Sequence, residues 1–212
     1  MSEFSRTNRK DAIREAKRTI ILDAALEVFE RDGLEAASMR AIGNAAGYTA
    51  AAIYFHFPSK EAIYEELLSR SLDRLIAAVE AASDYDSAPG QQLEAAALAF
   101  FDFYAANPRD LDLGFYLFRG GVQPRGLSRE ADAALNDKLL QSLAPVALAA
   151  RNLGATRQVV QSIVADIFAH AVGLLVSEHT GRMKLFGARP RKLMQDQIGR
   201  IVHELSDRQG AL

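Results

Sequence analysis

Polar side chains that suit phosphate oxygens and base edges are concentrated between residues 38 and 60. Hydroxyl, imidazole and cationic groups form hydrogen bonds with phosphates, and an arginine can also bind the edge of a guanine. The segment holds seven such residues: Ser38, Arg40, Tyr48, Thr49, Tyr54, His56 and Lys60. We interpret these residues as candidate contacts to double-stranded DNA.

Two short helices, expected over residues 39–46 and 50–55, would position these side chains. Ser38 can cap the first helix, Gly47 allows a tight turn between the two, and Pro58 ends the second. Small or apolar residues stand where the helices can pack together: Ile42, Ala45, Ala46 and Ile53. The two alanines predict a close approach. Since such a pair cannot bury itself alone, flanking helices must cover it, as in a helix-turn-helix unit.

This segment resembles the N-terminal signature of TetR-type repressors. The resemblance is carried by four stretches: 38–42 (SMRAI), 45–49 (AAGYT), 53–57 (IYFHF) and 59–61 (SKE). It covers roughly residues 20–68, and the rest of the chain is similar only in length and number of helices. The resemblance implies a homodimer, a palindromic operator and an inducer pocket in the C-terminal domain. It also implies that the seven residues lie at the DNA, with Tyr54 and Lys60 on phosphates.

Two features depart from the family pattern. Gly43 stands where an alanine is common, and glycine costs about 1 kcal/mol of helix propensity relative to alanine. The middle of the second helix is Ala50–Ala52, and alanine can contact a thymine methyl group but cannot form a hydrogen bond with a base. We therefore expect sparse base recognition, which would rest on Arg40, Tyr48 and Thr49 together with DNA shape.

The aromatic residues around position 56 have two interpretations each. We expect Phe55 and Phe57 to be core residues and Tyr54 to be the exposed one. His56 is either a DNA contact or a structural residue. Lys60 lies at the start of a helix, where its charge opposes the helix dipole, so an additional partner such as phosphate is indicated.

Composition excludes several classes of protein. The chain has 212 residues, a formal net charge of −2 and no cysteine, which excludes disulfides and thiol catalysis. Six basic residues against three acidic ones precede Ile20, and they form either a DNA-binding arm or a solvated terminus. No signal peptide is indicated. Charge interrupts the apolar stretches before the roughly 20 residues of a membrane span, so we expect a cytoplasmic protein with no membrane partner.

The periodicity of apolar residues predicts an all-α fold of about nine helices. We expect a helix-turn-helix DNA-binding domain over residues 1–60 and a helical ligand-binding and dimerisation domain over residues 61–212. Pro145 is expected to kink one long helix that spans residues 128–153.

The helix expected over residues 157–178 is apolar around nearly its whole circumference, so it must be covered on more than one face. With the helix near residues 190–207, it predicts a four-helix dimer interface. The alternative is a central helix buried in a monomer.

An aromatic cluster between residues 100 and 118 suits a small apolar or aromatic inducer of unknown identity. The alternative is ordinary core packing. Six residues are candidate ligand contacts: Phe103, Tyr104, Tyr116, Arg119, Asp166 and His170. An enclosed cavity beside the cluster would favour a ligand-responsive regulator over a DNA-binding protein that has no small-molecule switch.

An enzyme is the least favoured alternative. The sequence contains no nucleotide-binding glycine motif, no nucleophile elbow and no metalloprotease motif. Asp166 and His170 share one helical face, but two ligands make a weak metal site. We therefore expect no catalytic residues, no cofactor and no metal.

Overall fold

A computed structural model describes residues 2–115 and 127–210, with side chains over residues 9–115 and 127–207. Within these ranges the chain forms helices and no strand, which confirms the all-α expectation. The α-helices are α1 (Ser2–Asp32), α2 (Met39–Ala46), α3 (Ala50–Tyr54), α4 (Lys60–Ala82), α5 (Pro89–Ala106), α6 (Pro108–Gly114), α7 (Arg129–Ser142), α8 (Ala144–Asn152), α9 (Arg157–His179) and α10 (Pro190–Gly210). A short 3₁₀ helix, η1 (Arg182–Phe186), lies between α9 and α10.

The described part has ten α-helices where the sequence predicted about nine, because the helix expected over residues 128–153 is two helices. α7 ends at Ser142 and α8 begins at Ala144, with Pro145 in its first turn. Proline has no N–H and is therefore favoured at a helix start. Buried Leu143 separates the two helices. Pro145 thus begins a new helix and does not merely kink a continuous one.

The chain divides into two compact units. Unit 1 comprises residues 1–70 and 112–133, and unit 2 comprises residues 71–111 and 134–212. Unit 1 therefore contains α1, α2, α3 and the start of α4, together with a later segment of the chain. The hydroxyl of buried Tyr64 donates a 2.6 Å hydrogen bond to the carbonyl oxygen of Leu113, which joins the two parts of unit 1.

The core of unit 1 forms where α1, α2, α3 and α4 supply large apolar side chains. The fully buried members are Ile21, Phe29, Ile42, Ile53, Phe57, Ile63 and Tyr64. The rings of Phe29 and Tyr64 meet edge to face, with their centroids 6.3 Å apart. These contacts hold the two short helices, which could not form a stable core by themselves.

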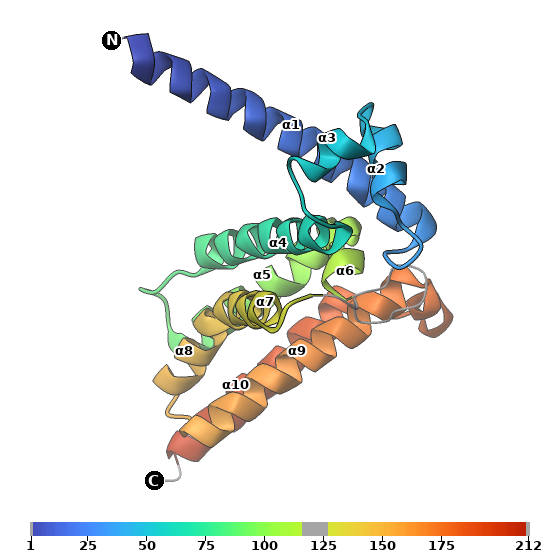
Figure 1. Ribbon diagram of the computed structural model, residues 1–212. Helices are drawn as coiled ribbons and strands as arrows, with labels where there is room; N and C mark the ends of the chain where they lie inside the picture. Colours follow the sequence, from blue (N-terminus) through green and yellow to red (C-terminus); the bar gives the residue numbers. More distant parts are fainter. Residues whose placement is uncertain (1, 116–126, 211–212) are drawn as a thin grey trace. The chain divides into compact units, whose positions relative to one another are not determined.

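Helix α1 begins far earlier than its packing requires. Its buried residues lie between Ile21 and Phe29, whereas Ile13 and Ile20 are about half exposed. The helix ends at Asp32 because Gly33 adopts φ 80°, a conformation that favours glycine. The N-terminal half of α1, dark blue in Figure 1, extends beyond α2 and α3.

Unit 2 is a bundle in which α5 packs against α8, α9 and α10, and α9 packs against both α8 and α10. Its buried side chains include Leu93, Phe100 and Phe101 of α5, Val146 of α8 and Ile167 of α9. The side chains of Arg191 and Asp102 form a bidentate ion pair between α10 and α5, at 2.8 and 2.9 Å.

By length and composition, one described helix, α9, passes the test for a membrane span, with a mean hydropathy of 1.9 over its most apolar window. Every 18-residue window of α9 contains Asp166, so a charge still interrupts the apolar stretch, as the sequence predicted. Only 33% of that window is buried within the structure. Its buried residues, Val160, Ile163, Ile167, Ala171, Leu174 and Leu175, follow one helical face and leave other faces of α9 at the surface of unit 2.

Candidate nucleic-acid interface

The turn between α2 and α3 is built by capping hydroxyls and one left-handed glycine. The Oγ of Ser38 accepts a 3.1 Å hydrogen bond from the N–H of Ala41 and caps α2. The Oγ1 of Thr49 accepts a 3.2 Å hydrogen bond from the N–H of Ala52 and caps α3. Gly47 ends α2 at φ 73°. Each capping hydroxyl still carries its own proton, which it can donate to a phosphate oxygen.

Gly43, not the two alanines, allows the close approach of α2 to the turn. A Cβ atom at this buried position would lie 2.9 Å from the carbonyl oxygen of Tyr48 and 3.3 Å from the backbone nitrogen of Ala50. By contrast, Ala45 is exposed and Ala46 half-buried. The expectation for the alanines was therefore wrong. The glycine that appears costly for helix propensity is required by packing.

Four of the seven candidate DNA contacts are exposed: Ser38, Arg40, Thr49 and Tyr54. Tyr48 is half-buried. Arg40 lies in the first turn of α2, and its side chain forms no hydrogen bond or ion pair within the described part of the chain. These five residues surround the start of α2 and the short helix α3, so one nucleic-acid surface could contact them together.

Phe55 was expected in the core, but the structure exposes 78% of it, whereas Phe57 is buried as expected. Helix α3 ends at Tyr54, so helical periodicity no longer decides which of the following residues point inward. The ring of Phe55 meets the imidazole of His56 edge to face at 5.3 Å. Phe55 therefore adds an exposed apolar group at the end of α3, which sequence reasoning missed.

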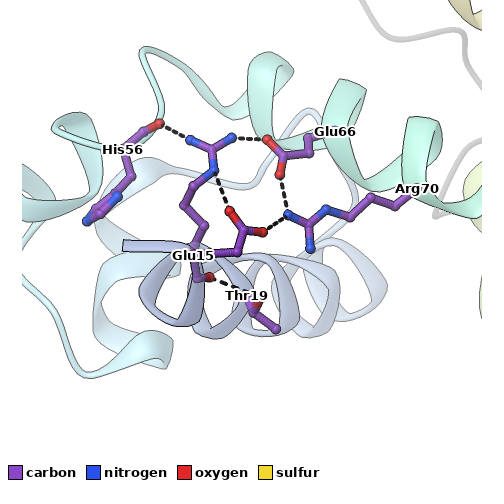
Figure 2. Close-up of polar contacts among 6 residues, drawn as sticks. Glu15, Thr19, His56, Glu66 and Arg70 are labelled. Atoms are coloured by element: carbon purple, nitrogen blue, oxygen red, sulfur yellow. Dashed lines mark hydrogen bonds and ion pairs between the residues drawn. The ribbon is translucent and has the colours of Figure 1, made fainter. Parts of the chain in front are cut away.

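His56 is held within unit 1 by its main chain. Its carbonyl oxygen accepts a 2.8 Å hydrogen bond from the guanidinium of Arg18 (Figure 2). Its Nδ1 is buried and has no hydrogen-bond partner among the described residues. Burial lowers the pKa of His56, and the positive charges of Arg18, Lys17 and Arg14 lower it further. The side chain is therefore neutral near pH 7, which makes it a poor cation for phosphate.

Arg18 is the centre of an ionic network that joins α1 to α4. Its guanidinium forms an ion pair with Glu66 and lies 4.2 Å from the ring centroid of Phe57. Arg70 of α4 forms 2.6 Å hydrogen bonds with both Glu15 and Glu66 (Figure 2). Burial lowers the pKa of Arg70, but the bonds to the two carboxylates outweigh it, so its pKa is raised. This network fixes α3's end against two long helices.

Lys60 has an internal role that the sequence did not indicate. Its ammonium donates three hydrogen bonds, to the carbonyl oxygens of Leu34 at 2.8 Å, Glu35 at 2.7 Å and Ala37 at 3.0 Å. An ammonium has three protons, so all of them are used. Its position at a helix start indicated an additional partner, and that partner is the turn between α1 and α2. For Lys60 to contact a phosphate, one of these three hydrogen bonds would have to break.

The four candidate ligand contacts that the structure describes do not line one groove. Tyr116 and Arg119 lie outside the described residues. Tyr104 is buried, and its ring centroid lies 5.3 Å from those of both Phe100 and Phe103. Its pKa is raised, mainly by burial and also by the negative charge of Asp110. Asp166 is exposed and accepts a 2.8 Å hydrogen bond from Gln197. The Nε2 of His170 is buried, with no hydrogen-bond partner in the described ranges.

An apolar groove of about 470 Å³ lies elsewhere in unit 2, between α7, α8 and α9. Its lining includes Leu139, Leu143, Ala147, Val160, Val164 and Phe168, with Arg151 as an ionisable member. The Phe168 ring lies 6.2 Å from that of Phe100, so the groove adjoins the aromatic cluster. A second groove of about 420 Å³ lies between α9 and α10 and includes Asp166.

Comparison with known proteins identifies the N-terminal segment. Residues 21–67 match the family described as bacterial regulatory proteins, tetR family. The transcriptional activator FasR of Mycolicibacterium smegmatis is 40% identical over 90 residues, which is 42% of this chain and 41% of that protein. The repressor KstR2 of Rhodococcus jostii is 42% identical over 59 residues, 28% of this chain and 29% of that protein. The chain thus spans less than half the length of these relatives.

Solved structures extend the likeness in fold to most of the chain. A tetR-family regulatory protein from Rhodococcus RHA1 has a TM-score of 0.69 at 20% identity, covering 89% of this chain and 96% of that one. FadR from Bacillus subtilis, solved in complex with stearoyl-CoA, has a TM-score of 0.68 at 17% identity, covering 87% and 97%. At these identities the likeness concerns the fold alone.

Proposed function

We propose that the chain belongs to the TetR family and that the whole protein is a dimeric DNA-binding transcriptional regulator. The observation that carries this proposal is the exposed set formed by Ser38, Arg40, Thr49 and Tyr54 around α2 and α3. Helix α3 would enter the major groove, and the hydroxyls and the guanidinium would contact phosphates and base edges. The helix-turn-helix domain would occupy about residues 1–60, and residues 61–212 would form the ligand-binding and dimerisation domain.

Within the expected contact set, Ser38, Arg40, Tyr48, Thr49 and Tyr54 are the proposed direct contacts, joined by exposed Phe55 at the end of α3. His56 and Lys60 act as positioning residues, because the bonds described above commit the His56 carbonyl and all three Lys60 protons to unit 1. Ala50–Ala52 cannot hydrogen-bond to bases. Recognition therefore rests mainly on Arg40, Tyr48 and Thr49, with DNA shape supplying the rest.

Two protomers would pair through α9 and α10. Support comes from the apolar character of α9, of which only a third is buried within one chain, and from the groove beside it that Val159, Ile163 and Ile201 line. A second copy would cover these faces. Two α3 helices would then reach successive major grooves, roughly 34–36 Å apart, so the operator should be an inverted repeat.

The regulatory signal would be a small apolar or aromatic ligand that binds in unit 2. The groove lined by Leu139, Val164 and Phe168 supports this proposal, because pockets for such ligands are mostly apolar with few polar groups. A ligand that binds one conformation better would shift the population away from DNA, which makes the protein a repressor in the simplest case. We assign it to the cytoplasm, without catalytic activity, cofactor or metal.

Selection from a randomised duplex library, followed by sequencing of the bound fraction, tests the proposal. We expect an enriched inverted repeat, which would establish sequence-specific binding by a dimer and provide a probe for ligand screening. If the folded protein enriches no sequence, the regulator hypothesis fails. If it enriches a repeat that no apolar ligand releases, a DNA-binding protein without a small-molecule switch is the better description.

Filling the groove tests the location of the ligand. In Val164→Trp a large ring would occupy the space between α8 and α9, so a ligand that releases wild-type protein should no longer release the variant. Phe103→Ala is the matched test of the aromatic cluster. Release that is lost only in Phe103→Ala would place the ligand at the cluster and not in the groove.

A further inference from the structure

Three cations form a stripe on α1, ahead of the residues that match the family. Lys10, Arg14 and Lys17 are spaced i, i+4 and i+7, so they lie on one face of the helix. All three are exposed, and none forms a hydrogen bond or ion pair within the described part of the chain. The family match begins only at residue 21. We call these three residues the α1 basic stripe.

Packing does not explain why α1 extends through this stripe. Every described residue from Arg9 to Lys17 is exposed, so this part of the helix buries no core side chain. Like charges at i, i+4 and i, i+3 spacing also destabilise a helix by a few tenths of a kcal/mol per pair. Of the two acidic residues within this part of α1, Glu15 is engaged by Arg70 on another side of the helix, and Asp11 forms no ion pair with the stripe among the described residues.

Contacts within unit 1 place the stripe beside the end of α3. Arg18, the residue after Lys17, donates its 2.8 Å hydrogen bond to the carbonyl oxygen of His56, two residues after α3 ends. The charges of Arg14 and Lys17 also act on the imidazole of His56. From that point α1 runs outward past α2 and α3 (Figure 1). At 1.5 Å per residue, the stripe spans about 10 Å.

We propose that the α1 basic stripe binds the phosphate backbone of DNA beside the groove that α3 occupies. This inference rests on the proposed function and extends it, because it adds a contact outside the helix-turn-helix. The stripe is long enough to reach two or three phosphates, which follow one another about every 3.4 Å of axis on one strand. Such contacts lengthen the binding site and strengthen it without regard to sequence.

The test is the salt dependence of binding to a duplex of random sequence about three helical turns long. Each phosphate contact adds roughly 0.9 to the slope of log affinity against log salt. The variant Lys10→Gln/Arg14→Gln/Lys17→Gln should therefore bind more weakly at low salt, with a slope smaller by about two to three. The matched control Arg182→Gln/Lys184→Gln/Arg189→Gln removes three exposed cations of unit 2 that lie between α9 and α10, and it should keep the wild-type slope.

An unchanged slope in the α1 variant overturns the inference and leaves the proposed function intact. If the control variant loses as much slope as the α1 variant, the effect is one of net charge and the inference also fails. If the wild-type protein binds neither random nor selected DNA, the proposed function fails and the inference fails with it.

A second measurement uses the unaltered protein and does not depend on the folding of a variant. Lysines are acetylated with and without DNA, and the modified positions are found by mass spectrometry. Lys10 and Lys17 should be protected by DNA, while Lys192, in α10, should react equally in both samples. Equal reactivity of Lys10 and Lys17 with and without DNA would contradict the proposal.

Discussion

The guanidinium of Arg18 donates a 2.8 Å hydrogen bond to the carbonyl oxygen of His56, which couples α1 to the residues that follow α3. The same guanidinium pairs with Glu66 and covers the ring of Phe57. One side chain thus connects the first helix, the end of the short helix α3 and the start of α4. This connection, and not only the apolar core, sets where α3 lies.

Replacing Arg18 tests that role. Arg18→Met keeps the apolar stem but removes the hydrogen bond, the ion pair and the cation–π contact, so the free energy of unfolding should fall by about 1.5–3 kcal/mol. Arg18→Lys keeps the charge but cannot reproduce the planar fork and should recover only part of this loss. Urea denaturation measures both variants. Full stability in Arg18→Met would show that the network is incidental.

Replacing Gly43 tests the close approach of α2 to the turn. Gly43→Ala gains about 1 kcal/mol of helix propensity, but its Cβ would lie 2.9 Å from the carbonyl oxygen of Tyr48. We expect net destabilisation and weaker DNA binding, because α3 must shift.

The matched control for Gly43 is Asn44→Ala, an exposed neighbour in the same helix. It should be neutral or slightly stabilising, since alanine has the higher helix propensity. Thermal unfolding compares the two variants. If the Gly43→Ala protein unfolds at the same temperature as the Asn44→Ala protein, the backbone around Gly43 can relax at no cost.

Lys60→Met distinguishes a structural lysine from a phosphate contact. The three carbonyl oxygens of Leu34, Glu35 and Ala37 would lose their shared donor, so stability should fall by about 1–3 kcal/mol. The salt slope of DNA binding by the folded variant should stay as in wild type. Unchanged stability with a slope smaller by about 0.9 would instead identify Lys60 as a phosphate contact.

His56 predicts a pH dependence of stability. Its pKa in the folded protein lies below the ordinary value of 6.5, chiefly because of burial. Below pH 6.5 the unfolded chain therefore binds the proton more readily than the folded one. Stability falls as the pH is lowered from 6.5 toward the folded-state pKa. His56→Gln should remove this component, which urea denaturation between about pH 5 and 7.5 can measure. Parallel pH profiles for both proteins would contradict the assignment.

The sequence predicted those features that depend on local pattern. The all-α class, the cap at Ser38, the turn at Gly47 and the buried positions of Ile42 and Ile53 follow from periodicity and capping rules, which act over a few residues. Phe55 could not be placed by such rules, because the short helix ends one residue before it.

Features that depend on contacts between distant residues were not predictable. Gly43 looks unfavourable until the carbonyl of Tyr48 is seen beside it, and Lys60 looks free until the turn after α1 is placed against it. The ion pair of Arg18 with Glu66 joins residues 48 positions apart. A pattern in one sequence gives no signal for such a pair.

The hydrogen bond from Tyr64 to Leu113 has a consequence for how the protein is made. The chain leaves unit 1 after residue 70 and returns to it only after more than forty residues that belong to unit 2. At a synthesis rate of roughly 5–20 residues per second, Leu113 is therefore synthesised several seconds after the first seventy residues. During that time the hydroxyl of Tyr64 lacks this acceptor, so unit 1 can be completed only after the first segment of unit 2 has been synthesised.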